Sequence, residues 1–183
     1  MKSIERIETK QNYNTIKMDA LERFNDSKYS YECLAILIGL DTGLRVSDLL
    51  RLKVSDISYN EDGNRYECKS DIKKTNVKGH TTLISRGTYK AFKELCLSDG
   101  YIFTNPKTGN LFTRIWLSKR TNLRYGFSFH TLRKVSAMRI LEVGTLVDAK
   151  RHLAHKRIAS TDAYLNVTEK DSLDRLSSLY NKP

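Results

Sequence analysis

Four separated stretches of the sequence hold residue types that are suited to chemistry on a phosphodiester. They combine positive charge, groups that transfer protons near neutral pH, and a hydroxyl that can act as a nucleophile. The stretches are "TGLRVSD" with Arg45, "IKKTNVKG" with Lys73, Lys74 and Lys78, "HTLR" with His130 and Arg133, and "LAH" with His155, which Tyr164 follows by nine residues.

Taken singly, each stretch has an ordinary structural explanation. An arginine at a helix start and lysines in a turn are usually solvated charges, and a tyrosine beside a leucine is usually a half-buried aromatic. His130 and Arg133 are three residues apart and share one face of a helix, as many surface pairs do. The functional interpretation therefore depends on the combination and order of the four stretches.

That order resembles the catalytic domain of the tyrosine recombinase, or phage integrase, family over roughly residues 15–180. The family carries "TGxRxSE", a lysine in a β-hairpin, "HxLR", "LGH" and a tyrosine nine residues later, and this chain reads "TGLRVSD", "KKTNVK", "HTLR", "LAH" and tyrosine. Two positions differ. Asp48 replaces a glutamate and keeps the carboxylate, whereas Ala154 replaces a glycine and adds a methyl group beside His155.

The resemblance implies cleavage of DNA by a side-chain hydroxyl, with no metal or cofactor because side chains supply the positive charge. Arg45 and Arg133 would bind the scissile phosphate and stabilise the charge that grows in the transition state. A tyrosine hydroxyl has a reference pKa near 10 and needs help to attack. Tyr164 would be the nucleophile, His130 its proton acceptor, and His155 a hydrogen-bond donor to a phosphate oxygen.

The leaving 5′-oxygen needs a proton, and a lysine beside two arginines suits that role. Lys73 and Lys74 are neighbours, so on a strand they are expected to point to opposite faces. "KTNVK" resembles integrase hairpins in which the lysine before the threonine is catalytic. The resemblance therefore assigns the general acid to Lys74 rather than to Lys73 or Lys78.

Hydrophobic spacing predicts the elements that must position these residues. Between two helical regions, residues 56–85 change to short β-prone runs with turn signals at Asp62-Gly63 and at Asn76 with Gly79. The predicted fold class is mainly α with a small three-stranded antiparallel β-sheet (α+β), which matches the tyrosine recombinase catalytic-domain fold that the resemblance implies. Helices are expected over residues 15–27, 29–40, 45–57, 86–97, 114–126, 130–144 and 145–155.

The composition favours a polyanionic partner. The 183 residues carry a formal net charge of +11 with a pI of about 9.6, as is usual for domains that bind nucleic acid or an anionic surface. The longest apolar run, residues 33–40, is too short to cross a bilayer. The three cysteines have no metal-binding spacing and fit a reducing compartment. We expect double-stranded DNA as the partner, no membrane, and a location in the cytoplasm or nucleoid of a bacterial host.

Domain boundaries are expected after residues 14 and 167. Residues 1–14 form an N-terminal tail, residues 15–167 the catalytic domain, and residues 168–183 a C-terminal helix or tail with leucines on one face. In relatives the equivalent helix packs into a neighbouring protomer, so the resemblance implies self-association on DNA as a dimer or tetramer. Relatives also usually carry an N-terminal DNA clamp. Only about fourteen residues precede the first expected helix, so we expect weak DNA binding by this chain alone.

Site-specific recombination is the leading functional prediction, and two alternatives remain. A type IB topoisomerase-like enzyme would use similar side chains and relax supercoils without making recombinants. A non-catalytic DNA-binding regulator would keep the fold and lose turnover. The presence of Arg45, Arg133, His155 and Tyr164 argues against the second alternative.

Overall fold

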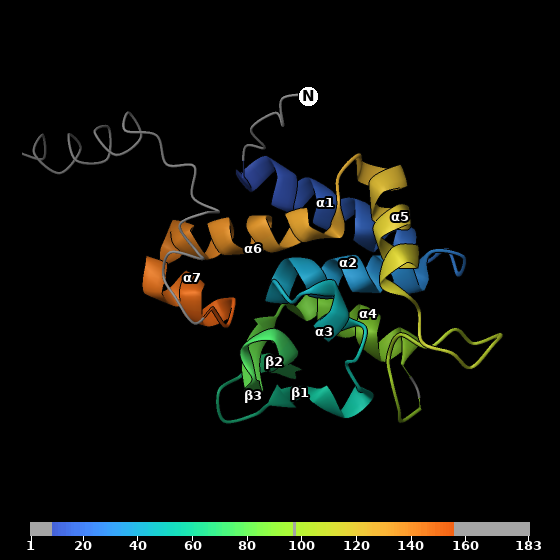
Figure 1. Ribbon diagram of the computed structural model, residues 1–183, viewed down its shortest axis with the longest axis horizontal. Coiled ribbons are helices and arrows are strands. Elements are labelled where there is room, and N and C mark those ends of the chain that lie inside the picture. Colours follow the sequence, from blue (N-terminus) through green and yellow to red (C-terminus); the bar gives the residue numbers. More distant parts are fainter. Residues whose placement is uncertain (1–8, 97, 156–183) are drawn as a thin grey trace, which may run out of the picture.

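The computed structural model describes residues 9–96 and 98–155 (Figure 1). Over these residues the chain is mainly helical with a three-stranded antiparallel sheet, so the predicted fold class is confirmed. None of the described helices has the length and hydrophobicity needed to span a bilayer. The helices are α1 (Thr9–Phe24), α2 (Ser30–Thr42), α3 (Val46–Leu49), α4 (Arg86–Leu95), α5 (Arg114–Tyr125), α6 (Phe129–Val143) and α7 (Leu146–His152), and the strands are β1 (Ile57–Asn60), β2 (Arg65–Ile72) and β3 (Val77–Ile84).

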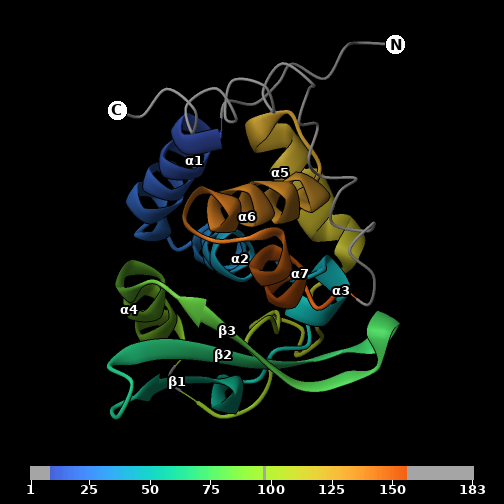
Figure 2. The same cartoon turned by 90° about the vertical axis from the view of Figure 1, so that its left-hand side faces the viewer.

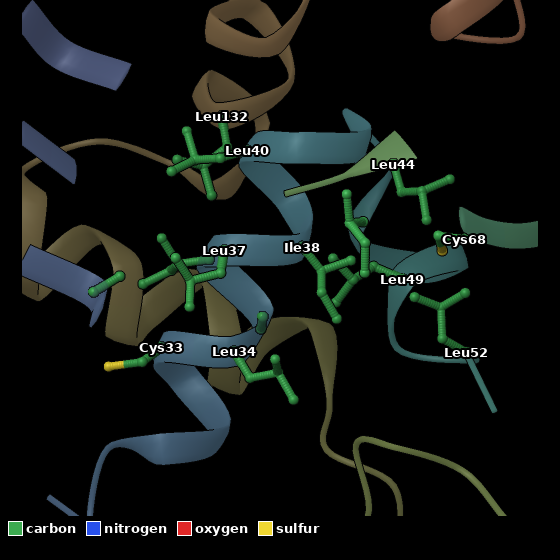
Figure 3. Close-up of a cluster of buried hydrophobic side chains, with 14 of the residues drawn as sticks. Cys33, Leu34, Leu37, Ile38, Leu40, Leu44, Leu49, Leu52, Cys68 and Leu132 are labelled. Carbon is green, nitrogen blue, oxygen red and sulfur yellow. The ribbon is translucent and has the colours of Figure 1, made fainter. Parts of the chain in front are cut away.

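Helix α2 forms the centre of the fold. Its sequence is apolar on every side, as expected of a helix that is surrounded by other elements. It packs against α1, α4, α5, α6 and β3. Figure 3 shows Leu40 facing Leu132 of α6 on one side of α2, and Ile38 facing Leu49 on another. The buried helix therefore holds α6, which carries His130 and Arg133, at a fixed distance from the loop that carries Arg45.

The sheet has the strand order β1-β2-β3, and Figure 2 shows it on one side of the helical layer. Cys68 of β2 pairs with Ile57 of β1 and with Thr82 of β3. The register of β2 and β3 shifts between Ser70 and Ile72, just before a short 3₁₀ turn, η2 (Lys73–Thr75), that joins the two strands. The predicted hairpin with lysines at its turn is thus present.

The expected helix over residues 45–57 is wrong beyond its first turn. Helix α3 ends at Leu49, and a 3₁₀ turn, η1 (Val54–Asp56), follows after an extended segment. The backbone of that segment bonds to a distant strand-like segment: the Ile102 amide donates to the Leu52 carbonyl, and the Val54 amide donates to the Gly100 carbonyl. This long-range pairing competes with the local helix that the leucine spacing favours.

The first helix also begins earlier than the expected residue 15, at Thr9. Its polar first turns lack apolar periodicity, but Tyr13 is buried and its hydroxyl donates to Asp41 of α2 over 2.6 Å. Lys17 forms an ion pair with the same carboxylate at 3.0 Å. Contacts with α2, rather than helical periodicity, extend α1 toward the N-terminus.

Candidate active site

Arg45 lies directly before α3, where it is the N-cap residue. The chain reaches this position through Gly43, which ends α2 with a positive φ of 62°. A Cβ at Gly43 would lie 2.8 Å from a Leu153 methyl carbon. Glycine is needed here both for the left-handed conformation and for the close approach of the two loops. The "TGLR" loop is therefore packed against the "LAH" turn.

Arg133 connects three of the four stretches that the sequence singles out. It is 3% exposed, and its Nη1 donates to the Gly43 carbonyl. Its Nη2 donates to the Leu153 carbonyl at 2.7 Å and to His155 Nε2 at 2.8 Å. A buried guanidinium needs such partners to offset its lost hydration. The contacts show that Arg133 organises the protein groups around the site, a role that its spacing from His130 did not indicate.

The "LAH" stretch is the C-terminal cap of α7. The His155 amide donates to the Lys150 carbonyl and the Ala154 amide to the Arg151 carbonyl, which is the Schellman pattern of hydrogen bonds. The residue at Ala154 must adopt a left-handed conformation, and its φ is 49°. This geometry explains why a glycine suits the position. The alanine of this chain keeps the cap, with a strained backbone.

His155 is 8% exposed. Burial is the main cause that lowers its pKa to about 4, and the positive charges of Arg133, Arg45 and Lys74 contribute to the same shift. A guanidinium nitrogen can only donate, so His155 Nε2 accepts from Arg133 and the ring is neutral. The sequence predicts a hydrogen-bond donor to phosphate. In the structure, Nε2 is instead an acceptor.

His130 lies in the first turn of α6, three residues before Arg133, and is exposed. Partial burial of the ring lowers its pKa, as do the charges of Arg133, Lys134, Arg45 and Lys74. The ring is therefore neutral near pH 7, which is the form that accepts a proton.

Lys73 and Lys74 are exposed in the η2 turn, not in a strand, so the expected alternation of their faces does not apply. The charge of Lys74 acts on both His130 and His155. Lys78 instead pairs with Asp71 at 2.7 Å on an exposed part of the hairpin. These positions favour Lys74 over Lys78.

Arg45 Nη1 and Asp48 Oδ2 are among the buried polar atoms that have no hydrogen-bond partner within the described residues. Asp48 is 4% exposed, and burial raises its pKa, although the charges of Arg45, Arg133 and Arg51 act in the opposite direction. The arginine nitrogen is a donor that an incoming anion could satisfy.

Tyr164 and the tail from residue 168 lie outside the described residues. A group that the sequence did not indicate adjoins the site. His152 accepts at its carbonyl from His80 Nε2 over 3.0 Å, and its own Nε2 lies 2.7 Å from Ser136 Oγ. Burial lowers the pKa of His152 to about 4, with smaller contributions from His80 and Arg133. Nothing in its local sequence marks His152 as half-buried.

Known proteins resemble this chain in sequence and in fold. The family model described as the phage integrase family matches residues 7–171. A tyrosine recombinase of Thermosipho africanus (strain TCF52B) is 26% identical over 164 residues, which cover 85% of this chain and 56% of that protein.

Two solved structures illustrate the similarity in fold. The XerH site-specific recombinase bound to difH substrate, in a pre-cleavage complex, has a TM-score of 0.71 at 17% identity over 96% of this chain and 54% of that one. A lambda integrase dimer bound to a COC′ core site has a TM-score of 0.62 at 23% identity, over 85% and 46% of the two chains. This chain thus spans about half the length of these relatives. Its motifs, its fold and the family match lead to one conclusion: the chain belongs to the phage integrase family.

Proposed function

We propose that this chain is the catalytic domain of a site-specific DNA recombinase that cleaves and rejoins strands through a 3′-phosphotyrosine on Tyr164. The observation that carries the proposal is the buried Arg133 fork, which bonds the loop before Arg45 and the turn before His155. An arginine that only added charge to the surface would be solvated, whereas Arg133 is buried where these two loops meet.

The chemistry is an in-line exchange of one phosphodiester for another. The Tyr164 oxygen attacks phosphorus, a new P–O bond forms, and the bond to the 5′-oxygen breaks. The tyrosine proton passes to the neutral ring of His130, and Lys74 protonates the departing 5′-oxygen. Rejoining reverses these steps when a 5′-hydroxyl attacks the phosphotyrosine. The phosphotyrosine bond retains the energy of the phosphodiester bond that was cleaved, so no nucleotide cofactor is consumed.

The arginines and His155 act on the non-bridging oxygens. Arg45 offers a buried nitrogen without a partner among the described residues, which a phosphate oxygen can take. Arg133 contributes its charge and fixes the ring of His155. A bound phosphate favours the protonated form of His155, since a nearby negative charge offsets the burial that lowers its pKa. Protonation turns His155 Nε2 from an acceptor into a donor, so the bond that Nε2 accepts from Arg133 gives way to one with a phosphate oxygen.

DNA binding by this domain should depend strongly on salt. The net charge of +11 supports an interface in which phosphate contacts supply most of the affinity. The logarithm of the binding constant is expected to fall with the logarithm of salt concentration, with a slope of about −0.9 per phosphate neutralised. A DNA substrate also implies that the protein works in the cytoplasm, at the nucleoid of a bacterial host.

The test of the proposed chemistry uses nicked duplexes that carry a randomised central segment. Cleavage beside the nick releases a short fragment and traps the covalent protein–DNA adduct. Wild-type protein should form the adduct, and Tyr164→Phe should form none while its DNA affinity stays nearly unchanged. Adduct formation by the Phe variant would exclude Tyr164. Relaxation of supercoiled plasmid without any recombinant product would favour the topoisomerase-like activity.

Assembly on DNA, as a dimer or tetramer, is the second part of the proposal. Residues 168–180 carry Leu173, Leu176 and Leu179 at helical spacing. A surface cavity of about 320 Å³ bordered by α1, β3 and α6 supports docking of this segment from a neighbouring copy. Leu83 and Val143 border the cavity and are more than half exposed.

Deletion of residues 169–183 and Val143→Asp should both preserve cleavage at a single site and abolish pairing of two sites. Leu123→Asp is the matched control, because Leu123 on α5 is also largely exposed and does not border this cavity. Recombination that survives both changes would contradict docking of the tail at this cavity.

A further inference from the structure

The His80–His152 hydrogen bond joins two parts of the proposed active site that are far apart in sequence. His80 lies in β3, on the strand that follows the Lys74 turn, and His152 is the last residue of α7, in the helix that leads to His155. His80 Nε2 lies 3.0 Å from the His152 carbonyl oxygen. Because a carbonyl can only accept, His80 carries its proton on Nε2.

The helix end that receives this bond is held from two sides. The last carbonyls of a helix have no partner within it, and here two successive ones accept side-chain bonds. His80 donates to the His152 carbonyl, and Arg133 donates to the Leu153 carbonyl. Ser136, three residues after Arg133 on α6, contacts the His152 ring at 2.7 Å. The turn before His155 is thus bonded to the hairpin on one side and to α6 on the other.

The His80–His152 hydrogen bond adds to the apolar packing of the hairpin, in which Ile72 belongs to the core and Val77 packs against it. Among the hydrogen bonds within residues 9–96 and 98–155, the bond from His80 to the His152 carbonyl is the one that joins residues 71–82 to the helical layer. The Lys78–Asp71 pair lies within the hairpin, on exposed side chains, and adds little to its position. The register shift between Ser70 and Ile72 further interrupts the ladder just before the lysine turn.

We propose that His80 is a positioning residue that holds the hairpin against the end of α7, so that Lys74 stays within reach of the leaving 5′-oxygen. This inference rests on the proposed function and on Lys74 as the general acid. His80 itself does not touch the substrate in this account. Its effect on catalysis passes through the lysine, which makes the effect separable from a general loss of folding.

The test compares ordinary nicked duplexes with duplexes in which sulphur replaces the bridging 5′-oxygen. A thiolate leaves without protonation, so the sulphur substrate does not need the acid. His80→Ala should slow single-turnover cleavage of the ordinary duplex by about tenfold to a hundredfold, the usual cost of a misplaced catalytic group. It should leave DNA affinity unchanged and cleave the sulphur duplex at the wild-type rate. His80→Gln, whose amide can donate to the same carbonyl, should recover part of the loss.

Control variants distinguish a failure of the proposed function from a failure of the role proposed for His80. Thr81→Ala changes an exposed neighbour on the same strand and should behave like wild type. Lys74→Ala should show the same rescue by sulphur. If wild-type protein forms no adduct, the proposed function fails. If Lys74→Ala is rescued and His80→Ala is slowed equally on both substrates, or is not slowed at all, only the role of His80 is overturned.

A measurement without DNA tests the positioning independently of activity. Hydrogen–deuterium exchange of residues 71–82 should accelerate in His80→Ala and remain at the wild-type rate in Thr81→Ala. Unchanged exchange in His80→Ala would overturn the inference whatever the cleavage assays give.

Discussion

Replacement of Arg133 by lysine keeps the positive charge and removes the planar fork. The fork makes three contacts, with the Gly43 and Leu153 carbonyls and with His155 Nε2. A lysine can reach one of these acceptors and leaves the other two buried without a donor. Hydrogen bonds to charged groups contribute about 1.5–3 kcal/mol each, so we expect Arg133→Lys to lower the free energy of unfolding by roughly 3 kcal/mol. For a chain of this length the midpoint of thermal unfolding should fall by roughly 6–12 °C.

The assay is urea unfolding followed by far-UV circular dichroism, together with single-turnover cleavage well below the unfolding midpoint. Cleavage should fall by about 10²-fold or more, since one group that stabilises the transition state is displaced. Arg139→Lys is the matched control, because Arg139 lies on the same helix, is exposed and contacts the Tyr13 ring at 4.2 Å. Arg139→Lys should lower the free energy of unfolding by less than about 1 kcal/mol. Equal destabilisation by the two substitutions would refute the connecting role of Arg133.

Two further predictions follow from the end of α7. Burial lowers the pKa values of His152 and His155 to about 4 from an ordinary 6.5, so the unfolded chain binds their protons at a higher pH than the folded one. Stability should therefore fall as the pH drops from 8 to 5, by about 2 kcal/mol per histidine, and His152→Gln should show a shallower fall in urea titrations. Ala154→Gly should change stability by less than about 1 kcal/mol, because relief of about 1–2 kcal/mol of left-handed strain is offset by a lost buried methyl and a looser unfolded chain. Ala154→Val should cost more than about 2 kcal/mol, and equal melting temperatures for the two variants would contradict the strain argument.

The sequence was informative wherever a local pattern matched the final environment. Helix α2 could be predicted because a short run that is apolar on every side belongs in a core, and the hairpin could be predicted from its β-prone runs and turn residues. Arg45 and Arg133 could be proposed as site residues because their motifs follow the order that the family shows.

The sequence was uninformative wherever distant segments decide the outcome. Residues 50–54 leave the helix because their backbone pairs with residues 100–102. The acceptor role of His155 and the half-buried position of His152 depend on Arg133, Ser136 and His80, which local spacing does not bring together. The strain at Ala154 arises from the left-handed conformation that the cap of α7 imposes on it, which the local sequence does not specify.

The most direct test of the account is to identify the atom that holds the DNA. The trapped adduct would be digested and sequenced by mass spectrometry, and the free end of the cleaved strand would be tested for labelling by polynucleotide kinase. The account predicts a 3′-phosphoryl link to the Tyr164 hydroxyl and a free 5′-hydroxyl on the other fragment, both lost in Arg45→Ala. A link to any other residue, or a 5′-phosphoryl link, would contradict it.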